Sequence, residues 1–155
     1  MNQAVAKEVR SVLIPLHELQ LLLPNAVIAE VIGYKQPEPV EEGKPDWLMG
    51  TAVWRGVIIP VVSFEGMLGE RVMIPGHRGR IVVMNTLNQN QQLTHVGLSV
   101  KAIPSLVRVS ADNVKPVNPE DEPDPLVKQY VELDMNPAVI PDLDEIERQV
   151  FDAMN

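Results

Sequence analysis

Fourteen prolines and nine glycines are spread along this chain of 155 residues, so few stretches are long enough for an extended helix. Frequent turn residues between short apolar runs are typical of proteins built from many short strands. The length is sufficient for one well-buried domain, or for two small subdomains that share a core. These features favour a β-rich fold.

The clearest strand signal is an apolar hairpin across residues 47–62. Arg55 and Gly56 separate two apolar runs, and Gly56 can adopt the positive φ that a tight reversal requires. The second run is rich in valine and isoleucine, which suit a half-buried pleated surface. Arg55 is a lone charge in this run, so it needs a partner or a solvent-facing turn. The segment indicates a binding module rather than a catalytic centre.

Further strands are expected in the apolar runs that turn residues delimit: 9–16, 19–24, 80–86, 93–100, 106–109 and 130–140. Asn136 and Pro137 are expected to break the last of these runs, since proline cannot donate to a strand ladder. The apolar residues between Val27 and Ile32 instead have the spacing of a short helical turn.

Surface loops are predicted where proline, glycine and acidic residues gather: 33–46, 65–79 with one helical turn near 65–68, and 116–125. A longer helix is predicted only over residues 142–154. Asp142 is its expected N-cap with Glu145 three residues on, and apolar residues follow at helical spacing. We expect a single domain over residues 9–151, a short tail at 1–8 and the helix end at 152–155.

The charge of the chain constrains its partners. Thirteen basic residues stand against 21 acidic residues, which gives a net charge of −8. Binding to nucleic acid or to anionic membrane depends on the opposite balance, so neither is an expected partner. No cysteine is present, which excludes disulfides, thiol catalysis and thiolate metal sites. Residues 1–10 lack the apolar core of a signal peptide, and no apolar run approaches the ~18 residues of a membrane span. A cytoplasmic location is expected.

No catalytic, cofactor or metal site is predicted. His17, His77 and His95 are far apart and lack metal-ligand spacing. Ser63 is not surrounded by a nucleophile-elbow motif, and no glycine-rich loop joins a strand to a helix. The acidic residues at 120–124 lack the glycine turn of a calcium-binding loop, so a solvated loop is the preferred interpretation.

Four residues are candidates for interaction rather than catalysis. Glu30 and Arg55 are charges between apolar residues, and each is costly to bury alone, so we predict that they form an ion pair. Trp47 and Trp54 are the two tryptophans of the chain. Two interpretations remain open for them: packing in the core, or an exposed aromatic anchor at an interface.

Short motifs follow one another along the chain in a characteristic order: Ala29-Glu30-Val31-Ile32, Pro45, Leu48, Gly50, Arg55-Gly56, Ile58-Ile59-Pro60-Val61, Leu68-Gly69, Val96-Gly97-Leu98 with Val100, and Ala138-Val139-Ile140 with Asp142-Leu143. In this order and spacing, from about Val9 to about Phe151, the chain resembles the CheW-like domain. Three positions depart from the usual family pattern: Val53, Ser63 and Lys101. The Trp54-Arg55-Gly56 and Ser63-Phe64-Glu65 variants are more similar to the divergent ChpC- and PilI-like adaptors of pilus-associated chemosensory systems.

The resemblance implies an all-β fold of two intertwined five-stranded SH3-like barrels that share a core, with short helices and a C-terminal helix. It also implies a noncatalytic adaptor without a cofactor. The implied partners are the regulatory domain of a CheA-type histidine kinase, the cytoplasmic tip of a chemoreceptor and other CheW-like proteins. Glu30 and Arg55 are then expected to orient the contact surface, with Trp47 and Trp54 packed near it. Gly56 and Pro60 complete the candidate partner-binding set.

Three alternative functions remain open from the sequence. An accessory CheW-like protein binds a receptor or another adaptor without touching the kinase. An SH3- or OB-like barrel that binds nucleic acid is disfavoured by the negative charge and by the few aromatic residues available for stacking. A small hydrolase is disfavoured because no nucleophile has a base at suitable spacing.

Overall fold

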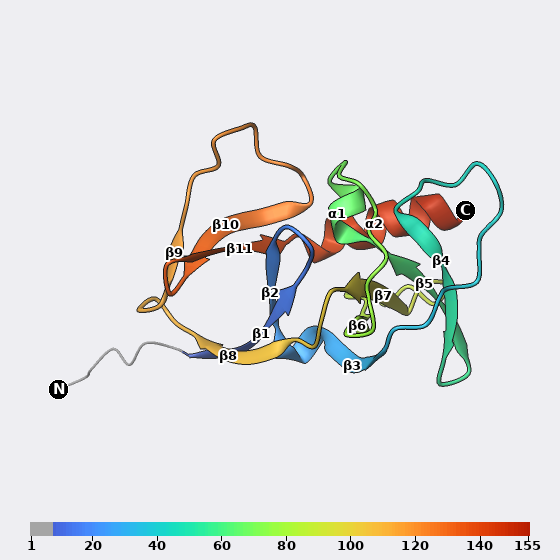
Figure 1. Cartoon of the computed structure of the whole chain (residues 1–155), viewed down its shortest axis with the longest axis horizontal. Coiled ribbons are helices and arrows are strands. Elements are labelled where there is room, and N and C mark those ends of the chain that lie inside the picture. Colours follow the sequence, from blue (N-terminus) through green and yellow to red (C-terminus); the bar gives the residue numbers. More distant parts are fainter. Residues whose placement is uncertain (1–7) are drawn as a thin grey trace.

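The strands of the chain form two sheets, and the first sheet takes its strands from both ends of the sequence (Figure 1). A computed structural model describes residues 8–155. The predicted tail therefore lies outside the described residues, apart from Glu8, as does most of the segment considered for a signal peptide. Among residues 8–155, no helix is long and apolar enough to cross a membrane.

The first sheet has six strands in the order β8-β1-β2-β11-β10-β9. Its strands are β1 (Val9–Pro15), β2 (Gln20–Pro24), β8 (Ser105–Val109), β9 (Val114–Pro116), β10 (Val127–Leu133) and β11 (Asn136–Pro141). All neighbours pair antiparallel except β11 and β2, which pair parallel. This sheet forms the first barrel, on the left in Figure 1.

The second sheet is inserted between β2 and β8 and has five strands in the order β3-β6-β7-β5-β4. Its strands are β3 (Ile28–Gly33), β4 (Leu48–Trp54), β5 (Val57–Val62), β6 (Arg80–Asn85) and β7 (His95–Val100). Three helical segments complete the fold: η1 (Asn25–Val27), α1 (Phe64–Met67) and α2 (Leu143–Met154). The second barrel thus interrupts the first in sequence, which confirms the predicted intertwined arrangement of two SH3-like barrels with a C-terminal helix.

Strands that face two cores explain the continuous apolar runs of the sequence. In β6, Ile81 and Val83 belong to the interior cluster of the second barrel, whereas Val82 and Met84 belong to the cluster shared by both barrels. Successive side chains of a strand point to opposite faces, so such a strand is apolar at every position. The first barrel has its own smaller interior cluster: Leu22, Val131, Leu133 and Ala138.

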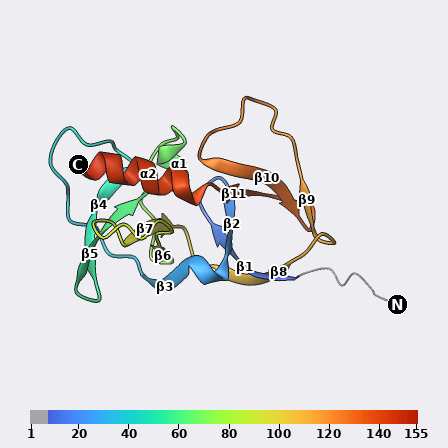
Figure 2. The ribbon, with the colours of Figure 1, turned by 180° about the vertical axis from the view of Figure 1, so that it is seen from behind.

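The C-terminal helix covers the shared core. Ile146 and Val150 of α2 are fully buried in it, and Figure 2 shows α2 leaving β11 near the middle of the molecule and running alongside the second sheet. The side chain of Asp142 accepts a hydrogen bond from the backbone N–H of Glu145 at 3.0 Å. The predicted helix and its N-cap are therefore confirmed.

Three local expectations need correction. The helical turn predicted between Val27 and Ile32 is confined to η1, and the rest is strand β3, paired with β6. A register irregularity between Ile28 and Glu30 shifts the strand alternation, which produced the misleading spacing.

The second correction is that the 130–140 segment does not break at residues 136–137, which begin β11. The chain reverses at Asp134 and Met135, both with positive φ.

The third correction concerns strand number, since the first sheet has six strands rather than five. The extra strand is β9, which has three residues and pairs with β10. Its turn from β8 is fixed by Asn113, whose side chain accepts from the Ser110 backbone N–H at 2.9 Å and donates to the Arg108 carbonyl at 2.8 Å. This strand lies between the predicted strand 106–109 and the predicted loop 116–125, and it shares only Pro116 with that loop.

Candidate functional site

The β4–β5 hairpin ends in the two-residue turn that the sequence predicts. Trp54 pairs with Val57, and the turn residues Arg55 and Gly56 have φ values of 49° and 77°. Two left-handed residues match the twist of antiparallel strands. Arginine adopts this conformation less readily than glycine, and the contacts of its side chain hold it there. The hairpin tip projects from the lower right of the second barrel in Figure 1.

The predicted ion pair between Glu30 and Arg55 is present. The Oε1 atom of Glu30 lies 3.2 Å from Nη2 of Arg55 and accepts from its Nε at 3.3 Å. The same oxygen accepts a hydrogen bond from Nε1 of Trp54 at 2.9 Å. The Arg55 side chain is 70% exposed, so the pair adds little to folding stability. Its main consequence is to fix the orientation of the hairpin tip.

This contact joins the two edges of the second sheet. Glu30 lies on β3 and Trp54 on β4, which are the outermost strands of the order β3-β6-β7-β5-β4. Further along the same edge, Glu38 and Thr51 exchange backbone hydrogen bonds at 2.8 and 2.9 Å. The close approach requires Gly50, because a Cβ there would lie 2.2 Å from the Glu38 carbonyl oxygen. The candidate site therefore lies on the seam that closes the second barrel.

His95 completes the cluster around Trp54. The two ring centroids are 4.6 Å apart at an interplanar angle of 54°. The Arg55 guanidinium lies 5.2 Å from the centroid of the Trp54 ring, within the range of a cation–π contact. Partial burial lowers the pKa of His95, which favours its neutral form beside the indole. Sequence reasoning treated His95 as an ordinary strand histidine, because nothing local connects it with a tryptophan 41 positions earlier.

The outer face of the hairpin carries exposed apolar side chains. Val53 and Ile58 are directly opposite each other on β4 and β5, and they are 72% and 70% exposed. The hairpin face, defined as Val53 and Ile58 together with Arg55 at the turn, combines exposed aliphatic groups with a guanidinium group of the kind enriched at protein interfaces. Trp54 and Val57 are the next cross-strand pair and point to the other side of the hairpin.

Trp47 lies apart from this cluster. It precedes the opposite end of β4, packs partly buried against the shared core, and its carbonyl accepts a hydrogen bond from the Ser63 N–H at 2.9 Å. A Cβ on Gly66 would lie 2.9 Å from the Cβ of Trp47, so α1 packs closely on it. The two tryptophans thus do not form one neighbourhood, and the contacts of Trp47 are those of core packing.

Pro60 is buried in β5 opposite Thr51. Both backbone hydrogen bonds of Thr51 go to Glu38, so Thr51 and Pro60 form a non-hydrogen-bonded pair. The ladder between β5 and β7 begins one residue later, at Val61. The missing N–H of proline is therefore tolerated inside the sheet.

Two buried carboxylates were not identified from the sequence. Glu65 on α1 is 5% exposed and accepts from the backbone N–H groups of His17 at 3.0 Å and Glu18 at 2.6 Å. It thereby ties the β1–β2 turn of the first barrel to the second. Glu147 on α2 accepts from the Leu87 N–H at 2.9 Å. All three hydrogen bonds join segments at least 47 residues apart, which no local pattern reveals.

The side chain of Ser63 has a structural contact. Ser63 is buried, and its hydroxyl oxygen accepts from the Gly66 N–H at 3.0 Å as the N-cap of α1. Within residues 8–155, no group of three or more histidine, aspartate or glutamate side chains is placed to hold a metal ion. The arrangement at the hairpin tip can bind and orient a partner surface.

Comparisons with known proteins agree with this geometry. A comparison with curated protein sequences gives no match. Among solved structures, the scaffolding protein TtCheW from Thermoanaerobacter tengcongensis has a TM-score of 0.73 and 21% sequence identity, over 92% of this chain and 90% of that chain. This likeness establishes the fold. The family profile of the CheW-like domain matches residues 10–150, nearly the whole chain, and the protein therefore belongs to the CheW-like domain family.

Proposed function

We propose that this protein is a noncatalytic adaptor in bacterial chemosensory signalling, which couples the cytoplasmic tip of a chemoreceptor to the regulatory domain of a CheA-type histidine kinase. The observation that carries the proposal is the CheW-like domain match over residues 10–150. The fold likeness to a protein described as a scaffold supports it. The protein acts in the cytoplasm, in a chemotaxis or type IV pilus motility system.

The hairpin face is the surface that this proposal assigns to the kinase. Val53 and Ile58 supply exposed aliphatic area, and burying such area is the main favourable term in association. Glu30 holds both Trp54 and Arg55 in place before binding. Little side-chain freedom is then lost when the complex forms, which favours affinity.

The mechanism is a change of population rather than a chemical step. A receptor that binds the adaptor differently in its two signalling states shifts the kinase between its own states. The adaptor transmits this preference through a fixed geometry. The connection through Glu65 between α1 and the β1–β2 turn holds the two barrels in one relative orientation, as this role requires.

The test is a calorimetric titration of this protein with the regulatory domain of a CheA-type kinase from the same genome. The expected result is micromolar or tighter binding with a negative heat-capacity change, which marks burial of apolar surface. The double variant V53T/I58T is expected to weaken binding at least about tenfold. Leu106→Thr is the matched control, because Leu106 is 78% exposed on β8 of the first barrel.

Absence of binding by the folded protein would contradict the kinase contact. Binding to a receptor or to another CheW-like protein in the same experiment series would then identify an accessory role. Oligonucleotide binding that weakens with salt would instead favour a nucleic-acid-binding barrel.

A further inference from the structure

His95 lies at one end of the interior of the second barrel. It begins β7 and shares a face of that strand with Gly97, because alternate residues of a strand point to the same side. This face is the inner one, since a Cβ on Gly97 would lie 2.9 Å from the Ile81 side chain of the interior cluster. Trp54 packs against the same cluster. His95 is thus a partly buried part of the barrel rather than a surface histidine.

The Trp54 indole is held by three groups. Its Nε1 donates a hydrogen bond to Glu30 of β3 at 2.9 Å. The Arg55 guanidinium lies 5.2 Å from the indole centroid, and the His95 imidazole centroid lies 4.6 Å from it. Trp54 directly joins two residues of the hairpin face, Val53 and Arg55, in the chain. A shift of the indole is therefore passed on to the hairpin face.

The imidazole is the group among these three whose ordinary pKa lies closest to neutrality. The side chains around it are Trp54 and Arg55 of β4, Glu30 of β3, the neutral Asn85 directly opposite on β6, and Thr94, whose Oγ1 lies 3.0 Å from Nδ1. The neighbouring strand β5 has no titratable residue. Within residues 8–155, no carboxylate forms a salt bridge with the imidazole. The nearest one, that of Glu30, already accepts from both Trp54 and Arg55.

A positive charge on His95 is unfavourable in this arrangement. An imidazolium would contact the same indole ring as the Arg55 guanidinium, and two like charges would then lie close together. Partial burial lowers the pKa of His95 below its ordinary value of 6.5. The folded protein therefore binds this proton less tightly than the unfolded chain does. By linkage, the stabilising contribution is fully present above pH 6.5 and is lost as the pH falls through the lowered pKa.

We propose that His95 is a positioning residue for the hairpin face: its neutral imidazole holds Trp54 in place, and its protonation releases the indole and weakens kinase binding. The last step rests on the proposed function and adds regulation by pH to it. An acidified cell interior then weakens the coupling of receptor to kinase without any change in either partner.

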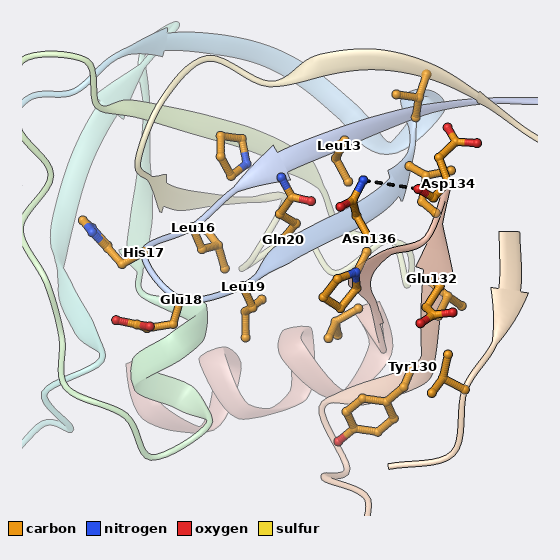
Figure 3. A pocket seen from close by; sticks show the side chains of 18 of the residues that line it. Leu13, Leu16, His17, Glu18, Leu19, Gln20, Tyr130, Glu132, Asp134 and Asn136 are labelled. Atoms are coloured by element: carbon orange, nitrogen blue, oxygen red, sulfur yellow. Dashed lines mark hydrogen bonds between the residues drawn. The ribbon is translucent and has the colours of Figure 1, made fainter. Parts of the chain in front are cut away.

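The other two histidines of the chain provide internal controls. His77 is exposed in the 65–79 loop. His17 lies at the β1–β2 turn, beside a groove of about 950 Å³ between that turn and strands β10 and β11 (Figure 3). Within residues 8–155, the ring contact between a histidine and a tryptophan is that of His95. Protonation of His17 or His77 should therefore leave the Trp54 indole unchanged.

The first measurement is a nuclear magnetic resonance titration of the full chain alone, from about pH 8 to about pH 5. The Cε1 signal of His95 reports its protonation, and the Nε1–H signal of Trp54 reports the position of the indole. Both are expected to shift with one common midpoint below pH 6.5, while the indole signal of Trp47 stays unchanged. His95→Phe keeps an aromatic ring against Trp54 but cannot be protonated, so its Trp54 signal should not follow the pH. His77→Gln is the matched control and should titrate like wild type.

The second measurement is calorimetry with the kinase regulatory domain at about pH 7.5 and about pH 5.5. The dissociation constant of wild type should rise about three- to tenfold more than that of His95→Phe between these conditions, since coupling of one pKa unit corresponds to tenfold. Any pH dependence of the kinase domain itself affects both proteins equally and cancels in this comparison. His77→Gln should again behave like wild type.

Two results would overturn the proposal. One is a Trp54 signal in wild type that does not follow the titration of His95. This result needs no variant, so it decides the matter even if His95→Phe folds poorly. The other is a kinase affinity with the same pH dependence in wild type and His95→Phe. Absence of kinase binding at both pH values, with Trp54 following His95, would instead contradict the proposed function and the last step of the inference, while establishing the positioning role.

Discussion

The two barrels differ in how their interiors are filled and closed. In the second barrel, four fully buried side chains from β5 and β6 fill the interior. The Glu30–Trp54 hydrogen bond joins the edge strands β3 and β4, and the Glu38–Thr51 bridge joins β4 to the segment after β3. In the first barrel, the interior cluster borders a groove of about 950 Å³. One barrel thus presents a rigid outer surface, whereas the other offers a concave surface. The two barrels therefore offer surfaces of different shape.

Truncation of one interior residue in each barrel should give the largest effects and the clearest difference. Ile81→Ala in the second barrel should lower the free energy of unfolding by about 3–4 kcal/mol, because it creates a new cavity in a filled interior. Leu133→Ala should cost about 1–2 kcal/mol less, because Leu133 already borders the groove. Urea denaturation measures both values, and equal costs would mean that the two interiors are filled alike.

Loss of the Glu65 contact between the barrels should have the next largest effect on the free energy of unfolding. Glu65→Ala leaves two backbone N–H groups without their charged acceptor, so we expect a loss of about 2–3 kcal/mol in the free energy of unfolding. Glu70→Ala is the matched control in the same segment, because Glu70 is exposed and should change stability by less than about 0.5 kcal/mol. A Glu65→Ala variant as stable as its control would show that the barrels do not depend on this connection.

A substitution at the seam of the second barrel should change the affinity for the kinase domain more than the free energy of unfolding. Arg55 is exposed, so Arg55→Ala should lower the free energy of unfolding by less than about 1 kcal/mol. Its affinity for the kinase domain should fall by a larger factor, since Arg55 belongs to the proposed contact surface. Thermal unfolding and calorimetry on the same sample separate these two effects. A marked loss of stability with normal affinity would make Arg55 a structural residue.

The smallest expected effect is on the pH dependence of the melting temperature. It arises from Glu145 in α2, the helix that covers the shared core. Hydrogen bonds from Arg148, and then from Gln149, hold the pKa of Glu145 at about 2, below its ordinary value of 4.5. A lowered carboxyl pKa contributes stability that is fully present above pH 4.5 and is lost as the pH falls towards 2. Glu145→Gln should therefore flatten the decline of the melting temperature in that window. Arg148→Gln should have the same effect, and an unchanged pH profile in both variants would contradict this assignment.

Features determined by neighbouring residues were predictable from the sequence. The Arg55-Gly56 turn and the Asp142 cap depend on residues within a few positions, and both are confirmed. The Glu30–Arg55 pair was also predictable, although the residues are 25 positions apart, because each is a lone charge in an apolar run. The family motifs then supplied the two-barrel arrangement that local patterns leave open.

Features determined by packing between distant elements were not predictable. The strand β3 was mistaken for a helical turn, because a register irregularity hides its alternation. The contact of His95 with Trp54 arises only when β4 and β7 are placed in one curved sheet. The groove depends on how far β10 and β11 stand from the β1–β2 turn, which is a property of sheet curvature rather than of any residue pattern.

The central proposal is that the second barrel, and not the first, binds the kinase. Its most direct test is a nuclear magnetic resonance titration of the labelled protein with the kinase regulatory domain. We expect the Trp54 indole N–H and the methyl groups of Val53 and Ile58 to shift, while the methyl groups of Leu13 and Leu133 in the groove stay unchanged. Shifts confined to the groove, with the hairpin face unaffected, would contradict the assignment of kinase binding to the second barrel.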